Sequence, residues 1–277
     1  MRMRKAARLA LRRLLLPLAA AYGLFVTAAC AFQEAIVWPL AGQELAPQTA
    51  PPGARVVQHD IADGRVPAWF FPAQGLSGEP GPTLIYFHGN GERIGNNVSL
   101  AEAYAARGIS VLLPEYRGYS GLGGKPTVDG LRVDMMFFRN WLAKQPEVDP
   151  RRIVYHGTSI GGAVAAELAQ VEPPAGLVLG STFTSMRAMA KARGLPEWLV
   201  EYDFKTDAVV EKAEFPVLVL HGNLDGTIPV SHGRELAKLG DHVRYVETEG
   251  GHAAALSREV FFEEIVPFVL EVTRNVE

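Results

Sequence analysis

The amino-acid sequence predicts an α/β fold with a mostly parallel, eight-stranded sheet that is covered by helices on both faces. Short runs rich in Val, Ile and Leu alternate along the chain with longer stretches of helical periodicity. The later apolar runs contain almost no polar residue, which is typical of parallel strands that are buried on both faces. The chain has 277 residues, which is enough for one large domain of this class to bury its own core.

The elements are expected in the order strand, strand, strand, helix, followed by alternating strands and helices. The predicted strands are β-rich runs bounded by turn residues, at 55–59, 66–71, 83–87, 110–113, 153–156, 177–179, 217–221 and 244–246. The helices are expected around 97–107, 128–144, 161–170, 231–239 and 257–272. The segment from Ser181 to Phe215 is too short for a large lid domain, so it predicts a short cap insert above a fairly open site.

Composition excludes several classes of function. Residues 1–13 contain six of the 27 basic residues and no acidic residue, so the rest of the chain is acidic although the net charge is only −3. An acidic body is a poor binder of nucleic acid, because phosphate neutralisation requires clustered Lys and Arg. The single cysteine excludes an intramolecular disulfide framework and a thiolate zinc cluster. The histidines show no helical metal spacing, so no metal and no cofactor are expected.

A serine lies in a G-x-S-x-G pattern between the fifth predicted strand and the helix after it. The pattern is Gly157-Thr158-Ser159-Ile160-Gly161. Such a chain reversal is so tight that side chains beside the serine must be nearly absent, which is why glycines flank it. This geometry exposes the hydroxyl at the carboxyl edge of the sheet, so Ser159 is the candidate nucleophile.

A serine nucleophile needs a base, and the base needs an acid that orients it. Asp225 lies in a turn just after the seventh predicted strand, and His252 lies in a glycine-rich turn after the eighth. Each residue alone has a structural interpretation, Asp225 as part of an Asx turn and His252 as a solvated loop residue. Their positions after neighbouring strand ends, in the chain order Ser159, Asp225, His252, predict a catalytic triad.

The remaining part of the predicted site is an oxyanion hole. The third predicted strand leads into the glycine-rich turn His88-Gly89-Asn90-Gly91. Backbone N–H groups approach a substrate closely in such a turn, and the N–H of Asn90 would act with that of Ile160 on a tetrahedral oxyanion. A dinucleotide-binding fingerprint that starts at Gly89 fails because Ile94 takes the place of its third glycine.

The N-terminal segment predicts a membrane anchor. Residues 14–33 carry no charge, and about twenty apolar residues match a hydrocarbon core of roughly 30 Å. A signal peptide cleaved at the small residues 28–31 and a lipoprotein modified at Cys30 are the alternatives. An uncleaved single-span anchor is favoured, because the apolar run has its full length and Trp38 follows soon after it.

The anchor divides the expected chain into three parts. Residues 1–38 would form a basic N-region and a single membrane-spanning anchor, residues 39–53 a Pro-rich spacer, and residues 54–277 the catalytic domain. Positive residues stay on the cytoplasmic side of a membrane. The catalytic domain is therefore expected on the non-cytoplasmic side, in the periplasm if the source is a bacterium.

Several motifs together resemble the α/β-hydrolase superfamily. They are His88-Gly89-Asn90, Glu115-Tyr116-Arg117-Gly118-Tyr119, Gly157-x-Ser159-x-Gly161-Gly162, Ser181-x-Phe183-Thr184-Ser185-Met186 and His221-Gly222-x-x-Asp225-x-x-Ile228-Pro229. The resemblance is to a branch of single-span, membrane-anchored serine hydrolases, some of which are protein depalmitoylases. It implies an α/β-hydrolase fold with Ser159 as nucleophile, Asp225 as acid, His252 as base, and Asn90 with Ile160 as oxyanion donors.

The leading functional interpretation is a serine hydrolase that cleaves carboxylic ester or thioester bonds through an acyl-enzyme. Its expected substrates are small-molecule or lipid-like acyl esters and thioesters. Two alternatives stay open, a serine peptidase of the same fold and a membrane-tethered scaffold without catalytic activity. In the insert, Leu195, Pro196, Trp198 and Leu199 would line an acyl groove, touch the bilayer or pack a short cap helix, and packing is favoured.

Overall fold

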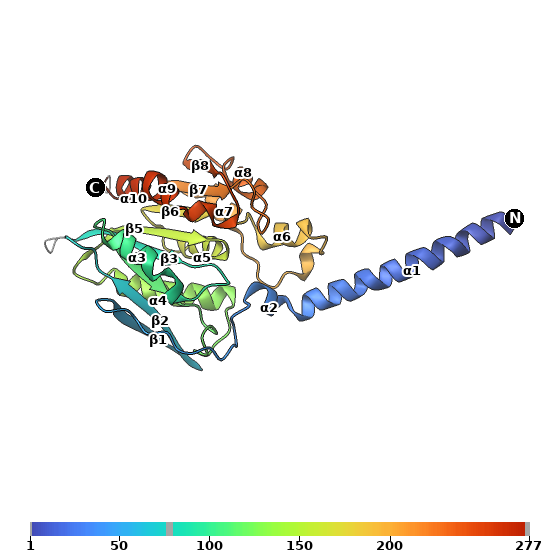
Figure 1. Ribbon diagram of the computed structural model, residues 1–277, viewed down its shortest axis with the longest axis horizontal. Coiled ribbons are helices and arrows are strands. Elements are labelled where there is room, and N and C mark those ends of the chain that lie inside the picture. The colour runs from blue at the N-terminus through green and yellow to red at the C-terminus, as the bar shows by residue number, and fades with distance from the viewer. Residues whose placement is uncertain (1, 76–79, 275–277) are drawn as a thin grey trace.

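The computed structural model describes residues 2–75 and 80–274, with the side chains of residue 13 and of residues from 15 onward. In these residues one sheet contains eight strands, in the order β1-β2-β4-β3-β5-β6-β7-β8 (Figure 1). Their bounds are β1 (Arg55–Ile61), β2 (Gly64–Phe71), β3 (Gly81–Phe87), β4 (Ser110–Pro114), β5 (Val148–Thr158), β6 (Gly176–Gly180), β7 (Val217–Gly222) and β8 (Val243–Thr248). Each strand lies where the sequence predicts one, so the predicted strands are confirmed.

The sheet is antiparallel at one edge and parallel elsewhere. β2 pairs antiparallel with β1 and β4, and every other pair of neighbouring strands is parallel. All residues of β3, β4, β6 and β7 are buried, as expected for strands covered on both faces. In the register, Phe87 pairs with Gly157, Thr158 with Gly180, and Gly222 with Thr248, so the parallel strands end at one edge.

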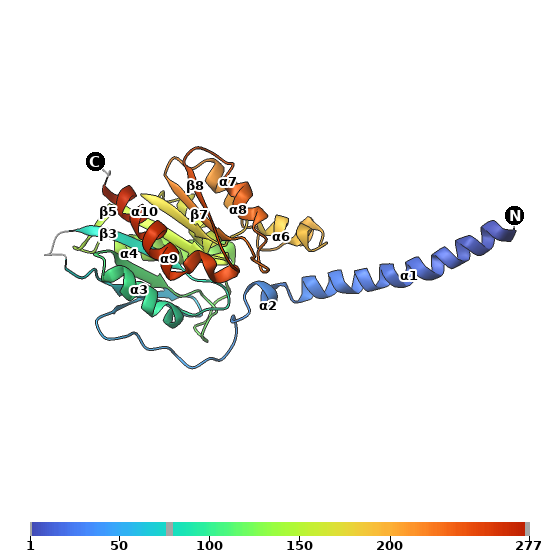
Figure 2. The same cartoon turned by 45° about the horizontal axis from the view of Figure 1, so that its top comes forward.

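Helices cover both faces of this sheet (Figure 2). α4 (Val128–Leu142), α5 (Ile160–Ala169), α7 (Thr206–Glu211) and α8 (Ser231–Leu236) contribute to one hydrophobic cluster. The other cluster includes α3 (Val98–Ala105) and a C-terminal helix composed of α9 (Arg258–Val260), a π-helical turn η4 (Phe261–Ile265) and α10 (Val266–Arg274). Side chains alternate along each strand between the two clusters, so Ile85 and Leu84 of β3 pack on opposite faces.

The insert between β6 and β7 is short, as predicted. It contains α6 (Met186–Ala192), the 3-10 turn η2 (Glu197–Leu199) and α7. Two further 3-10 turns, η1 (Ile94–Asn97) and η3 (His252–Leu256), follow β3 and β8. The predicted α/β-hydrolase fold, with a mostly parallel sheet and a short cap insert, is confirmed.

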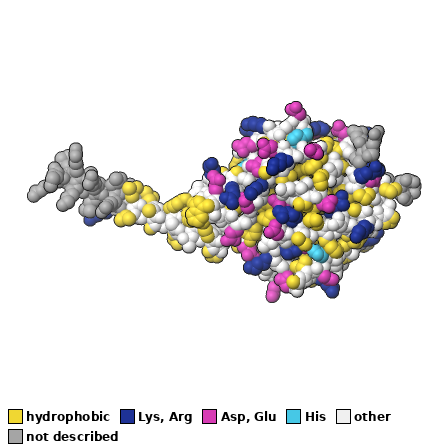
Figure 3. Space-filling model, turned by 180° about the vertical axis from the view of Figure 1, so that it is seen from behind, with side chains coloured by type: hydrophobic (Ala, Val, Ile, Leu, Met, Phe, Trp, Pro, Cys, Tyr) yellow, Lys and Arg dark blue, Asp and Glu magenta, His cyan; other side chains and the backbone are white. Residues whose placement is uncertain are grey.

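The N-terminal part of the chain is helical and leaves the domain as a projection (Figure 1). α1 (Arg2–Ala31) includes Pro17, and the short helix α2 (Gln33–Val37) connects it to the domain. Hydrophobic side chains lie along the described part of this projection, whereas basic and acidic side chains are scattered over the surface of the domain (Figure 3). The side chain of Trp38, directly after α2, is fully buried.

The predicted membrane anchor is wrong. Among the described residues, no helix combines the length and the apolar character needed to cross a membrane. Within α1, Pro17 and Thr27 interrupt the apolar run. A span needs about 20 mainly apolar residues. The predicted location on the non-cytoplasmic side of a membrane, or in a periplasm, depended on that anchor and is wrong with it.

Candidate active site

Ser159 lies on a strained turn between β5 and α5. Its backbone has φ 58° and ψ −126°, in a region that non-glycine residues rarely adopt. Glycines are required on both sides of Ser159, because any side chain there would clash with the backbone. A Cβ on Gly157 would lie 2.1 Å from the carbonyl oxygen of Gly161, and a Cβ on Gly161 would lie 2.0 Å from the carbonyl oxygen of Phe87. The N–H of Ser159 donates to the carbonyl of Gly180 at 2.8 Å, which fixes the turn against β6. The local sequence therefore builds the reversal that the motif predicts.

Asp225 and His252 are brought together at the ends of β7 and β8. Oδ2 of Asp225 lies 2.7 Å from Nδ1 of His252, and Oδ1 accepts the backbone N–H groups of Thr227 and Ile228 at 2.8 and 2.9 Å. Burial raises the pKa of this carboxyl, but the hydrogen bond with His252 and the two N–H groups outweigh it, so the pKa of Asp225 is lowered. Asp225 is therefore a carboxylate at neutral pH. Because a carboxylate only accepts hydrogen bonds, Nδ1 of His252 carries a proton and Nε2 is left to act as a base.

A second imidazole touches the same carboxylate. Nε2 of His221 lies 2.9 Å from the carbonyl oxygen of Ile228 and 3.3 Å from Oδ2 of Asp225. Burial lowers the pKa of His221 despite these acceptors, so the ring is neutral near pH 7 and keeps its proton on Nε2. The sequence places His221 in the same motif as Asp225. His221 and Asp225 are four residues apart across a turn, and this spacing in the sequence could have predicted their contact.

Ser159 is not hydrogen-bonded to His252 in the part of the chain that the structure describes. The two residues nevertheless follow strands that end at the same edge of the sheet. The turn η3, which begins at His252, packs over this edge, since a Cβ on Gly180 would lie 3.5 Å from Ala255 and 3.4 Å from Thr158. Serine–histidine hydrogen bonds are often long in free enzymes and shorten when substrate binds.

The turn after β3 brings its backbone toward Ser159. A Cβ on Gly89 would lie 3.8 Å from Cβ of Ser159. Among hydrogen bonds of the described residues, neither the N–H of Asn90 nor that of Ile160 has a protein acceptor. Asn90, Ser159 and Ile160 line the same cavity. The carbonyl of Asn90 accepts a 2.8 Å hydrogen bond from the hydroxyl of Tyr119, which fixes the peptide between Asn90 and Gly91.

A buried ion pair, formed by His88 and Glu115, stabilises this turn. Nε2 of His88 lies 3.0 Å from Oε1 of Glu115, and Nδ1 lies 2.9 Å from the carbonyl oxygen of Gly89. Both ring nitrogens thus face acceptors, which requires the doubly protonated imidazolium. Burial lowers the pKa of His88, but the hydrogen bond to Glu115 and its charge outweigh burial, so the pKa is raised above its usual 6.5. Glu115 also accepts the N–H groups of Tyr116 and Ile94, at 3.0 and 3.2 Å.

This ion pair predicts a pH-dependent stability. A histidine whose pKa is higher in the folded state than in the unfolded state stabilises the fold. Its full contribution to the free energy of unfolding is present below the pKa of the unfolded state, and it is lost as the pH rises through the pKa of the folded state. Glu115→Gln should lower the free energy of unfolding by about 3 kcal/mol or more near pH 6, and by less near pH 9. Urea unfolding at the two pH values measures both differences. The exposed Glu102→Gln variant is the control, and an equal loss for Glu115→Gln at both pH values would contradict the imidazolium assignment.

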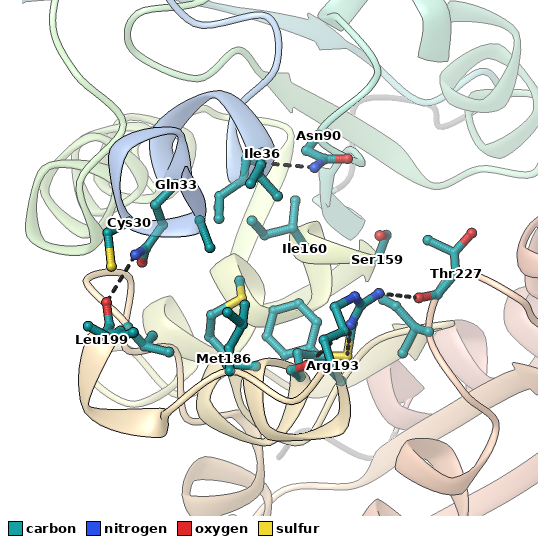
Figure 4. Close-up of a pocket in the computed structure, with 18 of the residues that line it drawn as sticks. Cys30, Gln33, Ile36, Asn90, Ser159, Ile160, Met186, Arg193, Leu199 and Thr227 are labelled. Atoms are coloured by element: carbon teal, nitrogen blue, oxygen red, sulfur yellow. Dashed lines mark hydrogen bonds between the residues drawn. The ribbon is translucent and has the colours of Figure 1, made fainter. Parts of the chain in front are cut away.

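The cavity beside Ser159 is apolar and lies under the cap. It has a volume of about 260 Å³, and most of the side chains that line it are hydrophobic. In Figure 4, Ser159 and Thr227 lie on one side of this cavity and Leu199 on the other, with Met186 between them. Arg193 of the cap donates to the carbonyl of Thr227 at 3.0 Å and so ties the cap to the turn that carries Asp225. The favoured expectation for Leu199 was packing of the cap, and the structure places it in the cavity lining.

The described residues contain no group of three or more His, Cys, Asp or Glu that could hold a metal ion. The charged residue Arg93, which follows the glycine-rich turn after β3, does not line this cavity. Its guanidinium donates to the hydroxyl of Ser120 and to the carbonyl of Ala46, both at 2.7 Å. Arg93 thereby attaches the irregular segment after α2 to the domain.

Comparison with known proteins agrees with the fold. A family model described as "Serine aminopeptidase, S33" matches residues 78–204. An uncharacterized protein of Mycobacterium tuberculosis is 35% identical over 245 residues, which cover 85% of this chain and 86% of that protein. The lysophosphatidylserine lipase ABHD12 of Danio rerio is 30% identical over 181 residues, which cover 57% of this chain and 47% of that protein.

Among solved structures, an esterase of Pyrococcus furiosus has the same fold, with a TM-score of 0.64 and 21% identity over 84% of this chain and 96% of that one. The fold and the match of the family model define a hydrolase of the α/β class. The chain belongs to the α/β-hydrolase family, with the M. tuberculosis protein as a relative over most of its length.

Proposed function

We propose that the protein is a serine hydrolase that cleaves carboxylic ester or thioester bonds, with Ser159, Asp225 and His252 as its triad. The observation that carries the proposal is the position of Ser159 on a strained turn, in one apolar cavity with Asn90 and Ile160, whose backbone N–H groups have no acceptor among the described residues. The hydrogen bond between Asp225 and His252 supports the assignment of acid and base. The likeness to esterases and to a lysophosphatidylserine lipase supports an acyl ester as substrate.

The first half of the reaction forms an acyl-enzyme. Oγ of Ser159 attacks the carbonyl carbon while Nε2 of His252 takes its proton, and the N–H groups of Asn90 and Ile160 stabilise the oxyanion. The carboxylate of Asp225 stabilises the imidazolium that forms. When the tetrahedral intermediate collapses, His252 returns the proton to the departing alcohol or thiol, and the acyl group stays on Ser159.

The second half of the reaction releases the acid. A water molecule attacks the acyl carbonyl while His252 takes its proton, so a second tetrahedral oxyanion forms in the same hole. Collapse of this intermediate breaks the bond to Oγ of Ser159, and the imidazolium returns a proton to the serine. The products are a carboxylic acid and the free enzyme, so the reaction consumes only water.

A fluorophosphonate probe tests the nucleophile. Labelling followed by peptide mass spectrometry should place the adduct on Ser159 at one equivalent per chain, because only an activated serine reacts with such a probe. Two other serines have a positive φ and act as internal controls: Ser181 is fully buried, and the hydroxyl of Ser120 accepts from Arg93. An unlabelled chain, or equal labelling of Ser120, would contradict the proposed nucleophile and favour a non-catalytic scaffold.

The family model favours a second candidate, a serine aminopeptidase that uses the same triad. A peptide substrate with a free amino group would need an acidic or carbonyl acceptor near Ser159, whereas the cavity is mostly lined by hydrophobic side chains. Kinetics with p-nitrophenyl acyl esters and with amino acid p-nitroanilides separate the two candidates. Faster cleavage of the anilides would support the peptidase.

A further inference from the structure

Residues 29–37, here called the N-terminal wall segment, contribute to the cavity that contains Ser159. Five of these residues line it, namely Ala29, Cys30, Gln33, Ile36 and Val37. α1 and α2 meet at Phe32, whose backbone is not helical; its N–H donates to the carbonyl of Ala28 at 3.0 Å, and its carbonyl accepts the N–H of Ile36 at 2.9 Å. Residues separated by three, four, seven or eight positions share one face of a helix. The segment thus presents residues of both helices to the cavity, opposite the cap.

Gln33 fastens the wall segment to the cap. Its Nε2 donates to the carbonyl of Leu199 at 3.0 Å, and its Oε1 accepts the N–H of Glu201 at 2.7 Å. Both ends of the amide are therefore satisfied by backbone groups on either side of Val200, which itself lines the cavity. This pair of bonds fixes the distance between the two walls.

The wall segment is also tied to the oxyanion turn. The carbonyl of Val37 accepts a 2.9 Å hydrogen bond from Nδ2 of Asn90. The indole of Trp38 is fully buried, and four aromatic rings make edge contacts with it, those of Tyr116, Tyr119, Tyr202 and Phe204. Such a group of aromatic contacts stabilises the position of the whole segment.

The cavity has a defined near end and far end. Ser159 lies with Thr227 at one side in Figure 4, and Cys30 and Leu199 lie at the other. A carbonyl group attacked by Ser159 would send its apolar substituent between the wall segment and the cap. An apolar cavity of about 150 Å³ holds a benzene ring, so by proportion 260 Å³ holds a chain of about ten carbons. Met186 and Met189 adapt readily to a flexible chain.

We infer that the N-terminal wall segment is a specificity element, which closes an acyl-chain pocket and sets the preferred chain length at about ten carbons. This inference rests on the proposed function, because it assigns the cavity to the acyl group of an ester or thioester. The helix that leaves the domain is then part of the substrate site, and Cys30 marks the far end of the acyl chain.

The test compares hydrolysis of p-nitrophenyl decanoate and p-nitrophenyl acetate by the full chain. Cys30→Trp places an indole at the far end of the pocket, where only the longer chain reaches. Exclusion of two methylene groups from an apolar pocket should lower the ratio of kcat/KM for decanoate over acetate about tenfold or more. Ala31→Trp is the matched control, because the neighbouring Ala31 is exposed and does not line the cavity, and its ratio should equal that of the wild type.

A second variant tests the fastening of the wall. Gln33→Leu keeps the size of the side chain but removes both hydrogen bonds to the cap, so KM for decanoate should rise while fluorophosphonate still labels Ser159. The inference would be overturned if Cys30→Trp left the decanoate-to-acetate ratio unchanged, or if Ala31→Trp changed that ratio equally. In either case, hydrolysis of the esters by the wild type would leave the proposed function intact. A wild-type chain that neither labels nor hydrolyses either ester would overturn both.

Discussion

Replacement of Ser159 by alanine should lower kcat for p-nitrophenyl acetate by a factor on the order of 10⁴ to 10⁶. The acyl-enzyme cannot form without Oγ, and the remaining oxyanion donors accelerate only direct attack by water. The backbone of residue 159 has φ 58° with serine in place, so alanine, which also carries a Cβ, adds little further strain. Steady-state kinetics with circular dichroism on the same samples measure the loss of turnover and the retention of the fold.

Ser231→Ala is the matched control for this experiment. Ser231 is an exposed residue at the start of α8 and lies outside the cavity. Its variant should hydrolyse the ester at the wild-type rate. If Ser159→Ala retained more than about a tenth of the wild-type kcat in a folded protein, the covalent mechanism proposed for Ser159 would be refuted.

Replacement of Asp225 by asparagine should reduce kcat by a factor on the order of 10⁴. An amide keeps the oxygen that accepts the N–H groups of Thr227 and Ile228, but it presents an N–H donor to Nδ1 of His252. The imidazole then takes the tautomer with its proton on Nε2, and it no longer accepts the proton of Ser159. The imidazolium of the transition state also loses the charge that stabilises it.

This variant should lose fluorophosphonate reactivity together with turnover, because both depend on an activated serine. The exposed Asp241→Asn variant is a control for charge and should behave as the wild type. A folded Asp225→Asn protein within tenfold of the wild-type kcat would mean that another group orients His252. His221 could not replace the aspartate in that role, because its neutral ring donates a proton from Nε2 rather than accepting one.

The order of strands and helices could be predicted from the sequence, because each element depends on the pattern of its own residues. Strands β3, β6 and β7 are nearly continuous runs of apolar residues, and burial on both faces requires that composition. The turn at Ser159 is equally local, since Gly157 and Gly161 are required by contacts of the same turn and of the adjacent β3. The roles of Ser159, Asp225 and His252 stay predictions until the kinetic experiments are made.

The N-terminal segment could not be assigned correctly from composition. An uncharged apolar run is compatible with a membrane, but it is also compatible with one helical face that lines a protein cavity. Gln33 and Leu199 are separated by 166 positions in the sequence, and Val37 and Asn90 by 53. The pattern of residues 14–38 contains no information about these distant contacts. The contact between His221 and Asp225 likewise depends on the path of the turn after β7.

The sequence by itself determined the layers of the domain, the strained turn and the chain order of the candidate triad, because these follow from periodicity and from steric limits within a few neighbouring residues. Only the tertiary structure decided that α2 lies against the turn after β3, that Gln33 joins the N-terminal helices to the cap, and that two imidazoles share one carboxylate. Those features depend on packing between distant segments, which is decided when the whole core forms.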